Sequence, residues 1–62
     1  MCEAAAYVLK DGKEELLMSE VDLIEPDGDV LRIVNIFGEQ KTIKAQIKSL
    51  NLVNHKVILV EK

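Results

Sequence analysis

Apolar and polar residues alternate along several stretches of the chain with the two-residue period of a β-strand. The clearest stretch is TIKAQIK, where Ile43, Ala45 and Ile47 alternate with polar residues and predict a half-buried strand. The alternation continues through Leu50 and Leu52. The uninterrupted apolar run VILV, residues 57–60, predicts a strand that is buried on both faces.

Two further runs depart from simple alternation. In DVLRIVNI the apolar positions change parity between Ile33 and Val34, which predicts a β-bulge or a sharp coil at that point. The run KEELLMSEVDLIE has apolar residues at helical spacing, but no N-cap residue opens it and turn sequences flank it on both sides. We therefore interpret residues 13–25 as a bent strand.

Turn sequences separate these runs at Asp11-Gly12, within EPDGD, at Phe37-Gly38 and at Asn54-His55. The chain is thus expected to form about five short strands, with no room for a crossover helix and with antiparallel connections. Five bent strands in 62 residues predict an all-β fold, a small SH3-like barrel in which residues 1–62 form one domain.

The charge balance narrows the classes of partner. The chain has 8 Lys and Arg against 11 Asp and Glu, a net charge of -3, which argues against binding to nucleic-acid phosphates or anionic membranes. Lys41, Lys44 and Lys48 keep a small RNA-binding or protein-interaction barrel as the alternative, although Tyr7 and Phe37 are the only aromatic residues available for stacking. The start of the sequence has no basic leader and no segment long enough to span a bilayer, so we expect a cytoplasmic protein.

Few residues could carry catalysis. The chain has one Cys, one His and two Ser, nothing in the sequence brings Cys2 and His55 together, and a domain of this size has little volume for a substrate pocket. The sequence therefore predicts that the protein is not an enzyme. His55 itself is interpreted as a solvated turn residue.

Cys2, the only cysteine, is either an uninvolved thiol or a metal ligand. The Met1 amine, the Cys2 amide nitrogen and the Cys2 thiolate follow one another, so a metal bound by all three would close two fused chelate rings. If the initiator Met is removed, Cys2 supplies its own amine and thiolate instead. Nitrogen and thiolate donors in a near-planar set suit Ni(II) or Cu(II). Glu3 could neutralise the cation or be an ordinary surface acid. One chain would leave such a site incomplete, whereas two N-termini that meet across a two-fold axis would supply two thiolates. A homodimer is therefore expected.

The segments MCEA, LKDGKEELLM, VDLIEPDGD, VNIFGEQK and VNHKVILVE occur in this order along the whole chain. In this order, with Cys2 directly after the first Met, they resemble the CooT family, small nickel-binding accessory proteins of carbon monoxide dehydrogenase maturation. The resemblance implies an SH3-like β-barrel, a homodimer, and Ni(II) binding that depends on Cys2. It also implies that the dehydrogenase or its other maturation proteins are the partners. Met1 and Glu3 enter the expected site only through donor chemistry, and the resemblance assigns no role to His55.

Overall fold

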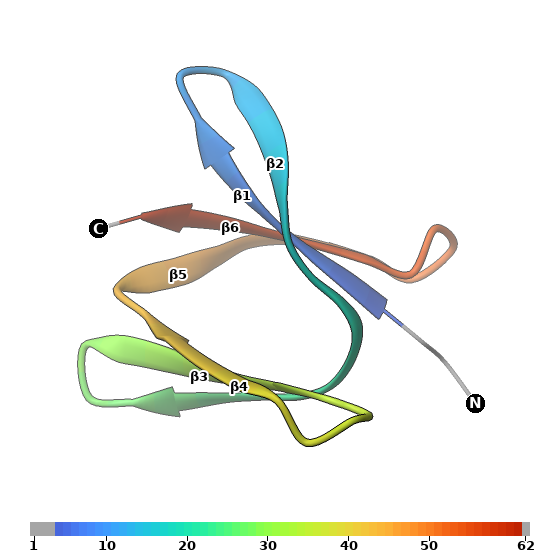
Figure 1. Ribbon diagram of the computed structural model, residues 1–62. Helices are drawn as coiled ribbons and strands as arrows, with labels where there is room; N and C mark the ends of the chain where they lie inside the picture. The colour runs from blue at the N-terminus through green and yellow to red at the C-terminus, as the bar shows by residue number, and fades with distance from the viewer. Residues whose placement is uncertain (1–3, 62) are drawn as a thin grey trace.

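A computed structural model describes residues 4–61 of the chain. Within that range all regular secondary structure is β-strand. The described residues contain no helix that is long and apolar enough to cross a membrane. The six strands are β1 (Ala4–Lys10), β2 (Lys13–Asp27), β3 (Val30–Asn35), β4 (Gln40–Ile43), β5 (Ala45–Asn51) and β6 (Lys56–Glu61). Figure 1 shows that they curl into a bent sheet with the shape of a half-barrel. The predicted all-β fold and small barrel are confirmed.

The strands lie in the order β4-β3-β2-β1-β6-β5 within one sheet. The expected number of about five strands was too low, because the TIKAQIK run bends at Lys44 and splits into β4 and β5. The expectation of antiparallel connections holds for every pair except β1 and β6, which are parallel. These two strands are the first and last of the chain, so no tight turn between them dictates an antiparallel direction. β4 and β5 are the edges of the sheet.

β2 is a single strand of 15 residues that bends in its middle, as the sequence predicted for residues 13–25. Glu20 adopts a left-handed backbone conformation with φ of 55°, and the pairing with β3 shifts register between Val21 and Leu23. Bulges of this kind increase local twist and redirect a strand. β2 can therefore pair with β1 in its first half and with β3 in its second half (Figure 1).

β3 contradicts the predicted change of parity between Ile33 and Val34. The strand remains regular, and its inward positions are Leu31, Ile33 and Asn35, all of them buried. The inward position after Ile33 is thus taken by a polar residue, and the apolar Ile36 lies beyond the strand with 43% of its surface exposed. The bulge is in β2 instead, because that strand has to pass from one neighbour to another.

The core lies on the concave side of the curled sheet. Ile33 and Leu59 are its largest fully buried side chains, and Val57, Ile58 and Leu59 confirm the predicted burial of the VILV run. The other buried apolar residues are Ala6, Val8, Met18, Val21, Leu31 and Ala45. The half-buried strand predicted from TIKAQIK is confirmed at Ile43 and Ala45, but Ile47, Leu50 and Leu52 of the same alternation are 50%, 58% and 75% exposed. β5 is an edge strand, and all its residues after Ala45 are exposed.

Candidate metal centre

The first described residues of the chain are held between two other parts of the sheet. Ala4 pairs with Val21 of β2, and the Ala5 amide donates a hydrogen bond to the His55 carbonyl oxygen at 2.8 Å. Ala5 is also paired with Lys56 at the start of β6. Of the two residues that follow Glu3 in the chain, Ala4 is therefore anchored to β2 and Ala5 to the end of the β5–β6 turn.

The β5–β6 turn is organised by its own side chains and backbone. The Asn51 side-chain oxygen accepts a hydrogen bond from the Asn54 amide at 3.0 Å, which is a common way for Asn to close a turn. His55 then adopts a left-handed conformation with φ of 52°. This conformation directs the His55 carbonyl to the start of β1, while the residue itself is exposed, as predicted.

An apolar cavity of about 240 Å³ lies beside the start of β1. Next to it, Leu50, Leu52 and Val53 are 58%, 75% and 88% exposed. A small domain seldom leaves neighbouring large apolar side chains in water unless a partner covers them. The residues that line the cavity are Ala4, Leu50, Asn51, Leu52, His55, Lys56 and Val57.

Lys56 carries the positive charge on this part of the sheet. Its ammonium lies 4.8 Å from the centre of the Tyr7 ring and forms an ion pair with Glu14. The hydrogen bond that the Lys56 ammonium donates to the Glu14 carboxylate raises the pKa of Lys56 above its ordinary value. Lys56 is thus charged at neutral pH and is a poor metal ligand.

The predicted ligands Met1, Cys2 and Glu3 lie outside the described residues. Within residues 4–61, the His, Asp and Glu side chains form no group of three or more that could hold a metal ion. In the described part of the chain, the anchored start of β1 adjoins the exposed His55 and the apolar surface of the β5–β6 turn.

The lysines behind the nucleic-acid alternative are distributed over two strands. Lys41 lies in β4 and its ammonium donates to the Leu17 carbonyl oxygen at 3.2 Å, Lys44 lies at the bend, and Lys48 lies in β5. β4 and β5 are opposite edges of the sheet. The three lysines therefore do not lie on one strand face.

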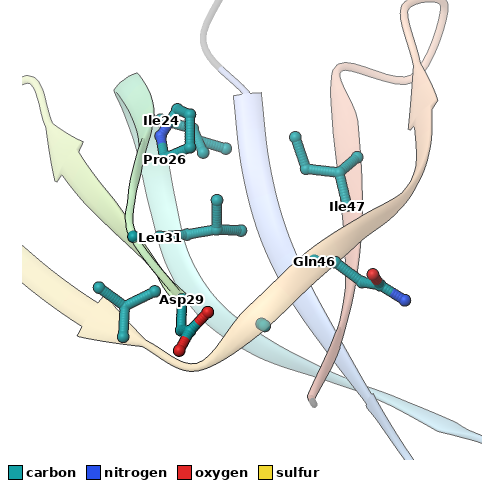
Figure 2. Close-up of a pocket in the computed structure, with 9 residues that line it drawn as sticks. Ile24, Pro26, Asp29, Leu31, Gln46 and Ile47 are labelled. Atoms are coloured by element: carbon teal, nitrogen blue, oxygen red, sulfur yellow. The ribbon is translucent and has the colours of Figure 1, made fainter.

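A second cavity, of about 260 Å³, lies where the half-barrel is open, between the β2–β3 hairpin and the first residues of β5. Figure 2 shows Ile24, Pro26 and Leu31 on one side of it and Ile47 on the other. Asp29 is the only titratable residue in its lining. This cavity extends the core toward solvent and does not have the donors of a metal site.

Sequence reasoning missed the importance of the β3–β4 turn. Asn35 is the one buried polar residue of the described chain, and Phe37, two residues later, is 71% exposed. The available signal was the sequence NIFGE, in which two large apolar residues stand inside a turn where polar residues are usual.

Comparison with known proteins identifies the family. The family described as CO dehydrogenase accessory protein CooT matches residues 1–60. The chain belongs to the CooT family. A crystal structure assigned to CooT from Carboxydothermus hydrogenoformans is 44% identical to this family member, covers 98% of both chains, and superposes with a TM-score of 0.92. The uncharacterized protein MJ1551 of Methanocaldococcus jannaschii is 31% identical over 59 residues, which are 95% of this chain and 96% of that protein. The predicted resemblance is confirmed, and the chain is a CO dehydrogenase accessory protein of the CooT family.

Proposed function

We propose that this protein binds Ni(II) at its N-terminus and supplies it to carbon monoxide dehydrogenase during maturation of that enzyme. The observation that carries the proposal is the family match over residues 1–60, which includes Met1, Cys2 and Glu3. We assign this role to the cytoplasm, where the Cys2 thiol would remain reduced. The nickel ion is cargo, so the protein has to bind it and then release it.

The chemistry of the proposed site follows from its donors. A thiolate binds Ni(II) more strongly than a thiol, so binding would release the Cys2 proton, and it would favour loss of the amide proton as well. The Met1 amine would complete one chelate ring. The Glu3 carboxylate would partly neutralise the incoming cation. Ligands at a chain terminus are displaced one at a time more easily than ligands within a closed cage, which suits a protein that passes its metal on.

We further propose that two copies form a homodimer and bring their N-termini to one nickel ion. Leu50 and Leu52 line a cavity together with Ala4, and Val53 follows them in the chain. All three are exposed, so burial of this surface against a second copy would remove large apolar side chains from water and supports this arrangement. The same contact would place both copies of Cys2 near one two-fold axis.

The test of nickel binding is native mass spectrometry and absorption spectroscopy of the protein with Ni(II), compared with Cys2→Ser. We expect one nickel per dimer and a thiolate-to-nickel charge-transfer band, and both should be lost in the variant while the far-ultraviolet circular dichroism is unchanged. His55→Ala is the matched control for a donor beside the site and should keep the band. Tight nickel binding by Cys2→Ser would refute the assignment of Cys2.

The test of the dimer is the molar mass in solution of Val53→Asp. A carboxylate at a position that is 88% exposed should leave the fold intact, but it would be buried without a counter-charge at the proposed interface. We expect the variant to be a monomer by light scattering. A dimer of unchanged stability would place the interface elsewhere.

A further inference from the structure

The turn between β3 and β4, residues 35–39, exposes more apolar surface than its role in the fold requires. Phe37, the only Phe of the chain, is 71% exposed, and its neighbour Ile36 is 43% exposed. Neither side chain contributes to the buried core. A large aromatic side chain gains much from burial in a partner's pocket, and such residues often dominate the energy of protein interfaces.

The same turn is held rigidly by a buried side chain. The Asn35 oxygen Oδ1 accepts hydrogen bonds from the amides of Phe37 at 3.0 Å and Glu39 at 2.9 Å, and its Nδ2 donates to Glu39 Oε1 at 2.7 Å. Two backbone bonds close the turn as well, from the Asn35 amide to the Glu39 carbonyl and from the Gly38 amide to the Asn35 carbonyl. The Phe37 ring is thus presented from a backbone that is already ordered, so binding through it costs little conformational entropy.

Two acidic residues, Glu20 and Glu39, adjoin the turn that carries Phe37. The Ile36 amide donates to the Glu20 carbonyl at 3.0 Å, so β2 presents Glu20 next to the turn, and Glu39 is part of the turn itself. The ammonium of the nearby Lys41 donates a hydrogen bond to the Leu17 carbonyl oxygen. An apolar knob with an acidic border fits a pocket with a basic border, and it does not fit an anionic lipid surface.

The turn also lies close to the start of β1. Val21 of β2 pairs with Ala4 on one side and with Asn35 on the other, so these three residues lie in one row across three neighbouring strands. Figure 1 shows the β3–β4 turn and the beginning of β1 near the same end of the sheet. A protein docked on Phe37 would therefore be adjacent to the N-terminus.

We propose that this turn is the docking site for nickel-free carbon monoxide dehydrogenase, and that Phe37 enters an apolar pocket with a basic border on that enzyme. The benefit of docking near the N-terminus rests on the nickel-delivery function proposed above. The docking contact itself requires neither nickel nor Cys2. It requires the exposed Phe37 ring, the ordered turn and the flanking carboxylates.

The experiment is isothermal titration calorimetry of the protein with purified nickel-free dehydrogenase. We expect Phe37→Ala to weaken binding at least tenfold, as alanine substitution of an anchoring aromatic does. Leu16→Ala is the matched control, because Leu16 is 59% exposed but lies on the β1–β2 hairpin opposite Tyr7, and it should bind as the original protein does. Glu20→Lys should weaken binding several-fold, and added salt should weaken binding of the original protein.

Three results would overturn the docking proposal. They are the absence of binding by the original protein, equal binding by a folded Phe37→Ala, and a change from dimer to monomer in that variant, which would make a second copy the occupant of the turn. Cys2→Ser separates this proposal from nickel binding. It should bind the nickel-free dehydrogenase with unchanged affinity, and Phe37→Ala should retain the nickel charge-transfer band.

Discussion

β6 and β5 are hydrogen-bonded neighbours of similar length, but they have opposite surroundings. Val57, Ile58 and Leu59 of β6 are buried, whereas every residue of β5 after Ala45 is exposed. β6 has four Val, Ile or Leu residues among six and β5 has two among seven, so composition explains part of the difference. β6 lies between β1 and β5, and β5 lies at the edge of the sheet. The difference teaches that apolar residues in a strand are buried only where other parts of the sheet cover them, because Ile47 and Leu50 of the edge strand β5 remain exposed.

The same contrast separates two regions of the molecule. The interior consists of the buried core residues, and the exposed rim consists of β5 after Ala45, the β3–β4 turn and the β5–β6 turn. The interior should determine the free energy of unfolding. The rim holds the apolar residues left for partners, Phe37 at one turn and Leu52 and Val53 at the other. Substitutions in the two regions should therefore have separable effects, on stability in the first and on association in the second.

The largest effect is expected from Leu59→Ala in the interior. Leu59 is fully buried, and such truncations cost about 2–5 kcal/mol. A domain of this size has only about 3–5 kcal/mol of stability from its core, so the variant should be partly or fully unfolded at room temperature. Denaturant titration measures this. Ile47→Ala on the rim is the control and should change stability by less than about 0.5 kcal/mol. Equal losses from both variants would remove the distinction between the regions.

Asn35→Ala tests the boundary between interior and rim. The substitution leaves the Phe37 and Glu39 amides without their side-chain acceptor and should cost about 1–3 kcal/mol. Denaturant titration gives the total loss, and amide hydrogen exchange should show faster exchange at these two amides. Asn35→Asp keeps an acceptor oxygen and should protect the amides better than alanine does. Unchanged exchange in Asn35→Ala would mean that the backbone alone orders the turn.

Gly38→Ala is a smaller perturbation of the rim. Gly38 has φ of 84°, and a Cβ built there meets no atom within 4 Å, so the cost would come only from backbone conformation. About 1–2 kcal/mol is expected for a left-handed alanine, measured by thermal unfolding. A larger loss would indicate that the whole turn rearranges.

The smallest effect is expected from the Lys56–Glu14 ion pair, which is exposed to solvent. Because Glu14 raises the pKa of Lys56, the pair stabilises the fold below the ordinary lysine pKa, and this contribution disappears as pH rises through the higher folded pKa. Denaturant titrations about one pH unit below and above the ordinary lysine pKa should show the loss. Glu14→Gln should show a smaller pH dependence over this window. The same slope in both proteins would exclude the ion pair as its source.

The locally encoded features were predictable from the sequence. Strand periodicity identified the segments that form strands, and the Asp11-Gly12 and EPDGD turns were recognised because few residues tolerate the required backbone angles. The bend in residues 13–25 was also predictable, because a helical interpretation lacked an N-cap. For the candidate site, Cys2 and its donor neighbours were chosen from covalent chemistry and family resemblance, and they remain a prediction.

Other features depend on residues that are far apart in the sequence, and only the tertiary structure decided them. The parallel pairing of β1 with β6, the burial of Asn35 and the exposure of Leu50 all follow from which strand lies beside which. Alternation states that a strand has an apolar face, but it does not state whether anything covers that face. The sequence by itself thus determined the strands, the turns and the candidate nickel donors. The tertiary structure decided which apolar residues form the core and which, like Phe37, remain at the surface for a partner.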